Sequence, residues 1–430
     1  MVIIFAMLNR LGIILERLII VVICVLLLTS SSPVSISTFD KVRAYTRDIE
    51  FDYIAWMLNA TGIKLEQGAA GIPGYLDNES SKVVVTTYLQ VTQQITQGEA
   101  ALNRVYADAS IKDKEAASAV IRAQLADLYK QQADLAPFAE AVLQKQVATV
   151  ASDFGLTTLG QPIPTILFHS SPVPNALIVS PRNHIEQVAN ISVLPDLSIE
   201  QQVTLENNVQ KGMDVSALVV PIGGVGVYPT MIMRTTDLSW LVDTIAHEWT
   251  HNYLELRPLG LLYDHTPELR TMNETTADIS GTEIGAEVMK RYYPEIKAAS
   301  LPDFNLVNLP QSHPNPGDLP RPPFDFRAEM HTTRVTVDAM LAAGKITEAE
   351  AYMEQRRKLF VKNGYTIRRL NQAYFAFYGA YADVPGGAAG EDPVGPAVRK
   401  LRAESKSLAD FINRIAWMTS FDQLKKVVGQ

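Results

Sequence analysis

The stretch that most constrains this chain is an H-E-x-x-H motif at residues 247–251. In an α-helix, residues four apart lie one above the other, so His247 and His251 can aim a ring nitrogen at the same ion. Glu248 is offset by a fraction of a turn, and it can reach a water on that ion without binding the ion itself. Two imidazoles and one carboxylate in this pattern predict a zinc site that activates water, with Glu248 as the general base.

The residues around the motif predict that it lies on a helix. Apolar side chains recur mostly at steps of three and four from Leu238 to Leu256, which is the period of an amphipathic helix. Thr236 or Asp237 can cap the start of this helix. The alternative is two histidines that merely share a helix, but in a chain with 7 histidines the motif arises by chance in roughly one per cent of cases.

A catalytic zinc site usually takes three protein ligands and leaves the fourth position to water. We expect Glu274 to be the third ligand, on a second helical segment that begins at Asn273 and returns antiparallel to the first. Glu274 and Asp278 share a face, so one carboxylate can bind the metal while the other accepts a ring N–H from a liganding histidine. Asp278 as the ligand, with Glu274 in support, is the alternative. Gly281 and Gly285 on that face predict close packing of the two helices.

Two further candidates for the third ligand are less favoured. The metzincin pattern needs glycine at position 254 and histidine at position 257, where this chain has Leu254 and Arg257. His265 lies in a predicted loop, with no helical geometry to aim its ring. Glu274 therefore remains the expected ligand.

The motif at residues 247–251, followed by Asn273-Glu274-x-x-x-Asp278, resembles the gluzincin branch of zinc metallopeptidases, the thermolysin-like group. This resemblance covers about residues 238–290. It implies that Glu274 binds zinc, that Asp278 supports a liganding histidine and that the chain hydrolyses peptide bonds. Residues 370–375 and the helices around them are similar to a bacterial family of predicted aminopeptidases with the same zinc motif, from which exopeptidase action is not carried over.

The hydrophobic pattern predicts an α+β fold that is predominantly α. A helical region at residues 31–155 precedes a zincin-like catalytic domain at residues 156–430, which has a small sheet beside the motif helix. An extended substrate could pair with the edge of that sheet. The expected elements after Gly155 are strands at 162–168 and 176–179, a helix at 198–211, a hairpin of strands 217–221 and 225–233 around Gly223 and Gly224, a proline-rich loop at 301–323 that contains His313, helices at 326–343, 346–363 and 365–381, and a final helical pair.

Three tyrosines share one face of the helix expected at residues 365–381: Tyr374, Tyr378 and Tyr381. Peptide hydrolysis builds negative charge on the former carbonyl oxygen, and a tyrosine beside the metal can stabilise it by donating a hydrogen bond. Any one of these three tyrosines, or Tyr253, could be this donor, and we take Tyr378 as the candidate. An aromatic stripe at this spacing also suits a hydrophobic core.

Residues 1–30 contain an uninterrupted apolar run from Leu18 to Leu28. This length suits a signal peptide, and the flanking residues make a membrane span possible. We expect a signal anchor or a cleaved signal peptide, and the alternative is a buried N-terminal helix in a cytosolic protein. The first gives a single-pass protein of the cell membrane with its catalytic domain on the extracytoplasmic side, and the second gives a secreted protein. The only cysteine is Cys24, so the chain after it forms no internal disulfide.

The net charge of −8 argues against a nucleic-acid partner, because phosphate binding requires a basic face. The expected function is zinc-dependent hydrolysis of peptide or protein substrates. The alternative is a zincin-fold binding or structural module that holds zinc without turnover. Hydrolysis of a non-peptide bond is also open.

Overall fold

The computed structural model describes residues 17–23, 37–71, 75–107, 111–296, 324–382 and 386–429. The chain divides into two compact units, Met1–Ala44 and Tyr45–Gln430. In the first unit, the described residues form a helix at 17–23 and helix α2 (Thr38–Arg43), whose start is closed by reciprocal capping between Ser37 and Asp40. The sheets and the candidate site belong to the second unit.

The prediction of a membrane-spanning segment within residues 1–30 is wrong. No helix among the described residues is long and apolar enough to cross a membrane, a crossing that takes about 20 apolar residues. Within this segment the structure describes residues 17–23 alone, and the rest of the predicted segment lies outside the described residues. The predicted single-pass location in the cell membrane is therefore wrong, and so is the extracytoplasmic placement of the catalytic domain that was derived from it.

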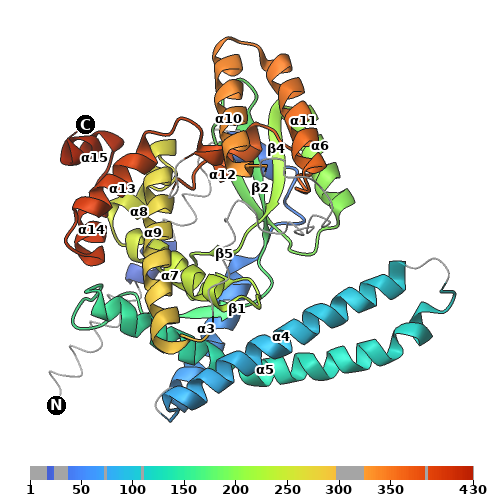
Figure 1. Ribbon diagram of the computed structural model, residues 1–430, viewed down its shortest axis with the longest axis vertical. Coiled ribbons are helices and arrows are strands. Elements are labelled where there is room, and N and C mark those ends of the chain that lie inside the picture. The colour runs from blue at the N-terminus through green and yellow to red at the C-terminus, as the bar shows by residue number, and fades with distance from the viewer. Residues whose placement is uncertain are drawn as a thin grey trace. The chain divides into compact units, whose positions relative to one another are not determined.

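Helices α3 (Tyr53–Ala70), α4 (Asn78–Ala107) and α5 (Lys114–Asp153) precede the first strand. Helices α4 and α5 lie side by side as a long antiparallel hairpin (Figure 1). Val91, Ile95 and Leu125 are buried between them. The end of α5 joins the main core through Val147 and Val150, so this hairpin is anchored where it meets the helices of the site.

The strands form two three-stranded sheets in the described residues. In the first sheet, β2 (Asn175–Pro181) lies between β3 (Ala189–Val193) and β4 (Val215–Pro221), and both pairings are antiparallel. In the second, β6 (Thr230–Ile232) is parallel to β1 (Phe168–Ser170) and antiparallel to β5 (Gly224–Val225). Small sheets in a mostly helical chain confirm the predicted α+β, predominantly α class.

The predicted hairpin around Gly223 and Gly224 is wrong. Strand β4 pairs with β2 in one sheet, whereas β5 pairs with β6 in the other. A Cβ at Gly223 would lie 2.7 Å from the ring of Trp240, and one at Gly224 would lie 2.5 Å from Oε1 of Glu248. The two glycines therefore let the chain pass closely over the motif helix, from one sheet to the other, and do not form a turn.

The later elements follow the predictions in part. Helix α12 begins only at Gln372, because Asn371 caps it by accepting a hydrogen bond from the backbone N–H of Tyr374 at 3.0 Å. The predicted strand at 162–168 reaches regular pairing only from Phe168, since Pro162 and Pro164 cannot donate to a ladder. The helices of the middle of the chain are α6 (Ile199–Met213), α7 (Leu238–Glu255), α8 (Pro258–Leu261), α9 (Pro267–Tyr292), α10 (Phe326–Ala342), α11 (Ile346–Lys362) and α12 (Gln372–Tyr378), followed by a 3₁₀ turn at Gly387–Ala389. The predicted final helical pair is wrong, because three helices follow that turn within the described residues: α13 (Val394–Glu404), α14 (Leu408–Ile415) and α15 (Phe421–Val428).

Two cores position the site. The main core packs α7 and α9 against α5 and the C-terminal helices α13–α15, around residues such as Trp249 and Phe411. The second core packs α10, α11 and α12 on the sheet of β2 and β4, around Phe360 and Phe375. The predicted loop with His313 lies outside the described residues.

Candidate metal centre

Helices α7 and α9 carry the motif residues. Asp237 caps α7, as predicted, by accepting from the backbone N–H of Trp240 at 3.1 Å. Helix α9 begins earlier than predicted, at Pro267, after the cap residue Thr266. Nearly every residue of α7 is buried, including His247 and Glu248, so the motif faces protein on all sides except at the site.

The two helices pack closely because glycines line their contact. A Cβ at Gly281 would lie 2.8 Å from the backbone oxygen of Asp243, and one at Gly285 would lie 1.6 Å from its Oδ1. Thr250 also donates a hydrogen bond across the contact to Ser280 at 2.8 Å. The close packing predicted from Gly281 and Gly285 is therefore confirmed.

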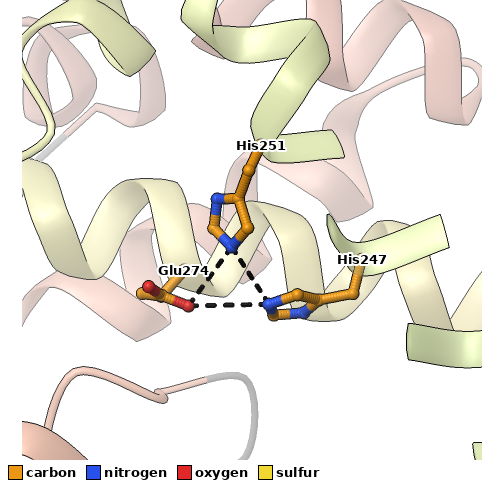
Figure 2. Close-up of side chains that lie close together, drawn as sticks. All are labelled: His247, His251 and Glu274. Atoms are coloured by element: carbon orange, nitrogen blue, oxygen red, sulfur yellow. Dashed lines mark hydrogen bonds and ion pairs between the residues drawn. The ribbon is translucent and has the colours of Figure 1, made fainter. Parts of the chain in front are cut away.

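Three ligand atoms converge between the helices (Figure 2). The Nε2 atoms of His247 and His251 are 3.0 Å apart, and each is 3.6 Å from Oε2 of Glu274. This Oε2 is buried and has no hydrogen-bond partner among the described residues. The structure thus brings together the three residues that the sequence predicts as metal ligands.

The opposite ring nitrogens are held by acceptors. Nδ1 of His247 is 2.9 Å from Oδ1 of Asp278, which is the support expected from the sequence. Nδ1 of His251 is 2.7 Å from Oδ1 of Asn273, whose own amide donates to the backbone oxygen of Leu259. Because both Nδ1 atoms face acceptors, each ring carries its proton on Nδ1 when it is neutral, and its Nε2 lone pair then faces the space beside Glu274.

Sequence reasoning missed three supporting residues. It gave Asn273 no role, although its place directly before Glu274 in the motif was a usable signal. Tyr263 donates a hydrogen bond to Oε1 of Glu274, and Arg270 donates to the hydroxyl of Tyr263 at 3.4 Å. Tyr263 lies between α8 and α9, where no periodic pattern indicates which way a side chain points.

The charged groups of the cluster shift one another's pKa values. Burial lowers the pKa of His247, but the carboxylates of Asp278, Glu248 and Glu274 outweigh burial and raise it to about 9. Burial raises the pKa of Glu274, but His251 and His247 outweigh burial and bring it to about 2. For Glu248, burial is the largest effect and raises the pKa above its ordinary value. A cation at the Nε2 atoms would therefore take the place of a proton.

The cluster opens into a cavity of about 720 Å³. Its walls include Glu248 and Gly224, together with Tyr53 from α3, Tyr378 at the end of α12 and Tyr381, which follows that helix. A cavity of this volume, with aromatic walls and a few convergent polar groups, is typical of a site for a small molecule or a short peptide segment.

Of the other residues that the sequence offers as oxyanion donors or metal ligands, some lie at the cavity and others do not. Burial raises the pKa of Tyr378 to about 12, so its hydroxyl stays a donor in the cavity wall. The ring of Tyr374 packs at a tilt against that of Tyr378, with ring centroids 4.5 Å apart. Tyr253 donates to Oδ1 of Asn413 at 2.9 Å, and His265 lines a separate, smaller cavity. Of the candidate donors for the oxyanion, Tyr378 and Tyr381 thus line the cavity of the cluster, and the hydroxyl of Tyr253 is bonded to Asn413.

No protein-family model, curated protein or solved structure matches this chain significantly. The function is therefore inferred from the site itself. Two imidazole nitrogens and one carboxylate oxygen are a donor set that catalytic zinc accepts. The buried Oε2 of Glu274, which has no hydrogen-bond partner among the described residues, fits a metal ligand, because a buried carboxylate oxygen is costly to leave without such a partner.

Proposed function

We propose that this protein is a zincin-like metallopeptidase of gluzincin type, which hydrolyses peptide bonds with zinc held by His247, His251 and Glu274. The observation that carries the proposal is the convergence of two Nε2 atoms and one buried carboxylate oxygen, 3.0 to 3.6 Å apart. Their open side faces the cavity, which leaves room for water and substrate. When bound, zinc supplies Lewis acidity and lowers the pKa of water.

Glu248 acts as the general base. It lines the cavity beside the three ligands but is not one of them. Burial raises its pKa, which brings the carboxylate closer to the range in which it accepts and returns protons efficiently. Glu248 accepts a proton from water as the water oxygen attacks the carbonyl carbon. It then gives this proton to the amide nitrogen, the C–N bond breaks, and the products are a carboxylate and an amine.

Tyr378 is the proposed hydrogen-bond donor to the oxygen that gains negative charge during the attack. Its hydroxyl lies in the cavity wall and remains protonated, because burial keeps its pKa near 12. The edge strand β5 forms another part of the wall, where an extended peptide has unpaired backbone groups to meet.

The test is the substitution Glu248→Gln, which keeps the size of the side chain and removes its basicity. We expect bound zinc to be retained and peptide hydrolysis to fall by roughly 10²- to 10⁴-fold. Elemental analysis and a peptide-library assay on the full chain measure the two quantities. Glu287→Gln, on the surface of α9, is the matched control, and it should leave both unchanged.

The possible results distinguish a peptidase from a module that holds zinc without turnover and from a hydrolase of another bond. Full hydrolysis by the Glu248→Gln variant would contradict the proposed mechanism. Zinc in a wild-type protein that cleaves no peptide would favour the alternative of a module that holds zinc without turnover. Hydrolysis of esters or other bonds, with peptides left intact, would keep the mechanism and change the substrate class.

A further inference from the structure

We infer that Tyr263 is a positioning residue that makes Glu274 present a single oxygen to the metal. This inference rests on the proposed function, since it concerns how the third ligand is oriented. Tyr263 lies in the segment between α8 and α9, and its ring packs edge-on against His251 with centroids 6.1 Å apart. It therefore contacts two of the three proposed ligands.

The two carboxylate oxygens of Glu274 have different surroundings. Oε1 accepts the hydrogen bond from the hydroxyl of Tyr263. Oε2 has no hydrogen-bond partner among the described residues and faces the Nε2 atoms of both histidines. A carboxylate that is bonded at one oxygen and open at the other is prepared to bind a metal in the monodentate mode.

Arg270 fixes the direction of the tyrosine proton. Its Nε donates to the hydroxyl oxygen of Tyr263 at 3.4 Å, and its Nη1 donates to the backbone oxygen of Ala376 at 2.9 Å. A guanidinium has donors only, so the Tyr263 hydroxyl accepts from Arg270 and must give its own proton to Glu274. The hydrogen bonds run in one direction, from Arg270 through Tyr263 to the ligand.

The same arginine connects Tyr263 to the helix that carries Tyr378 in the cavity wall. Ala376 belongs to α12, the helix that carries Tyr378. Arg270 is buried on α9, one turn before Glu274, so its hydrogen bond to Ala376 joins α9 to α12 at the level of the ligand. Removing the Tyr263 hydroxyl would leave Oε1 buried without a donor and free to turn towards the metal.

The test is Tyr263→Phe in the full chain, which removes one oxygen atom and keeps the ring. With cobalt(II) as the probe, wild type should show the strong visible absorption of a four-coordinate site. The variant should show the weaker absorption of a five-coordinate site, because both oxygens of Glu274 then bind. Zinc affinity, measured by chelator competition, should fall about 10- to 100-fold, as for other groups that orient a ligand.

Tyr228→Phe is the matched control, since Tyr228 lines the same cavity but its hydroxyl donates to the backbone oxygen of Thr165. It should leave the cobalt spectrum and the zinc affinity at wild-type values. Wild-type spectrum and affinity in Tyr263→Phe would overturn the inference while leaving the zinc site intact. A wild-type protein that binds neither zinc nor cobalt would overturn the proposed function and this inference together.

Discussion

Two pairs of antiparallel helices in this protein are packed in opposite ways. In α7 and α9, buried residues include charged and polar side chains such as His247, Asp278 and Arg270. In the hairpin of α4 and α5, the residues of α5 before Phe138 are mostly exposed, and of these only Ser118, Leu125 and Gln132 are buried. The first pair is enclosed on most sides, whereas much of the second is open to solvent.

The glycines at the two contacts show what this difference means. Gly285 on α9 faces Oδ1 and the backbone of Asp243, but Gly98 on α4 faces the end of the flexible Leu125 side chain, with 2.8 Å between a Cβ and Cδ2. A side chain can move aside, and a helix backbone cannot. The α7–α9 contact therefore fixes distances well enough to hold three ligand atoms in place, and the hairpin has no such requirement.

The largest expected difference between the two regions is the pH dependence of zinc binding at the α7–α9 site. Because the pKa of His247 is raised to about 9 in the metal-free protein, zinc must displace a proton at any lower pH. We expect zinc affinity to rise roughly tenfold for each pH unit between 6.5 and 8.5. Chelator-competition titrations at fixed ionic strength measure this slope, and an affinity independent of pH in that range would contradict the assigned ligands.

The stability of the metal-free protein should change with pH in the opposite direction. The folded-state pKa of His247 is above its unfolded value of about 6.5. Its contribution to the free energy of unfolding is therefore complete below pH 6.5 and is lost as the pH rises through about 9. Urea unfolding in the presence of a chelator measures this loss, which His247→Gln should remove.

Gly285→Ala should produce the next largest effect. A Cβ at Gly285 would lie 1.6 Å from Oδ1 of Asp243 and, even if that side chain turned away, 3.1 Å from its Cα. The backbone contact forces α7 and α9 apart, and overpacking of this kind destabilises a protein by about 1–3 kcal/mol. The same displacement should weaken zinc binding, because His247 lies one turn from Asp243 on α7. Urea unfolding and zinc titration of this variant should show both losses.

Gly98→Ala is the matched change in the α4–α5 hairpin and should have the smallest effect. Leu125 can rotate away, and alanine gains about 1 kcal/mol of helix propensity over glycine. We expect a change in unfolding free energy within about 1 kcal/mol, and zinc affinity equal to that of wild type. Equal losses of stability in both glycine variants would mean that the two contacts are not different in kind.

The sequence predicts the centre of the site well because that geometry is local. The placement of His247 and His251 on one face, and of Glu274 and Asp278 on another, follows from four-residue spacing within a helix. Gly281 and Gly285 then indicate that the two helices approach closely. No such rule applies to Tyr263, which comes from the segment between α8 and α9 and reaches Glu274 only through the tertiary fold.

The errors also have non-local causes. Two apolar runs around Gly223 and Gly224 look like a hairpin, but the pattern does not reveal that β4 pairs with the earlier strand β2 and β5 with the later strand β6. The helix predicted from residue 365 begins at Gln372, because the capping by Asn371 outweighs the apolar periodicity. Strand partners and caps depend on contacts that one segment does not contain.

The central claim is that α7 and α9 together hold one zinc ion. Elemental analysis of the purified full chain, beside its Glu274→Ala variant, tests this claim most directly. We predict about one zinc per wild-type chain and little zinc in the variant, because two imidazoles alone bind it weakly. A correctly folded wild-type protein without zinc, or a Glu274→Ala variant that keeps it fully, would contradict the assignment of this site.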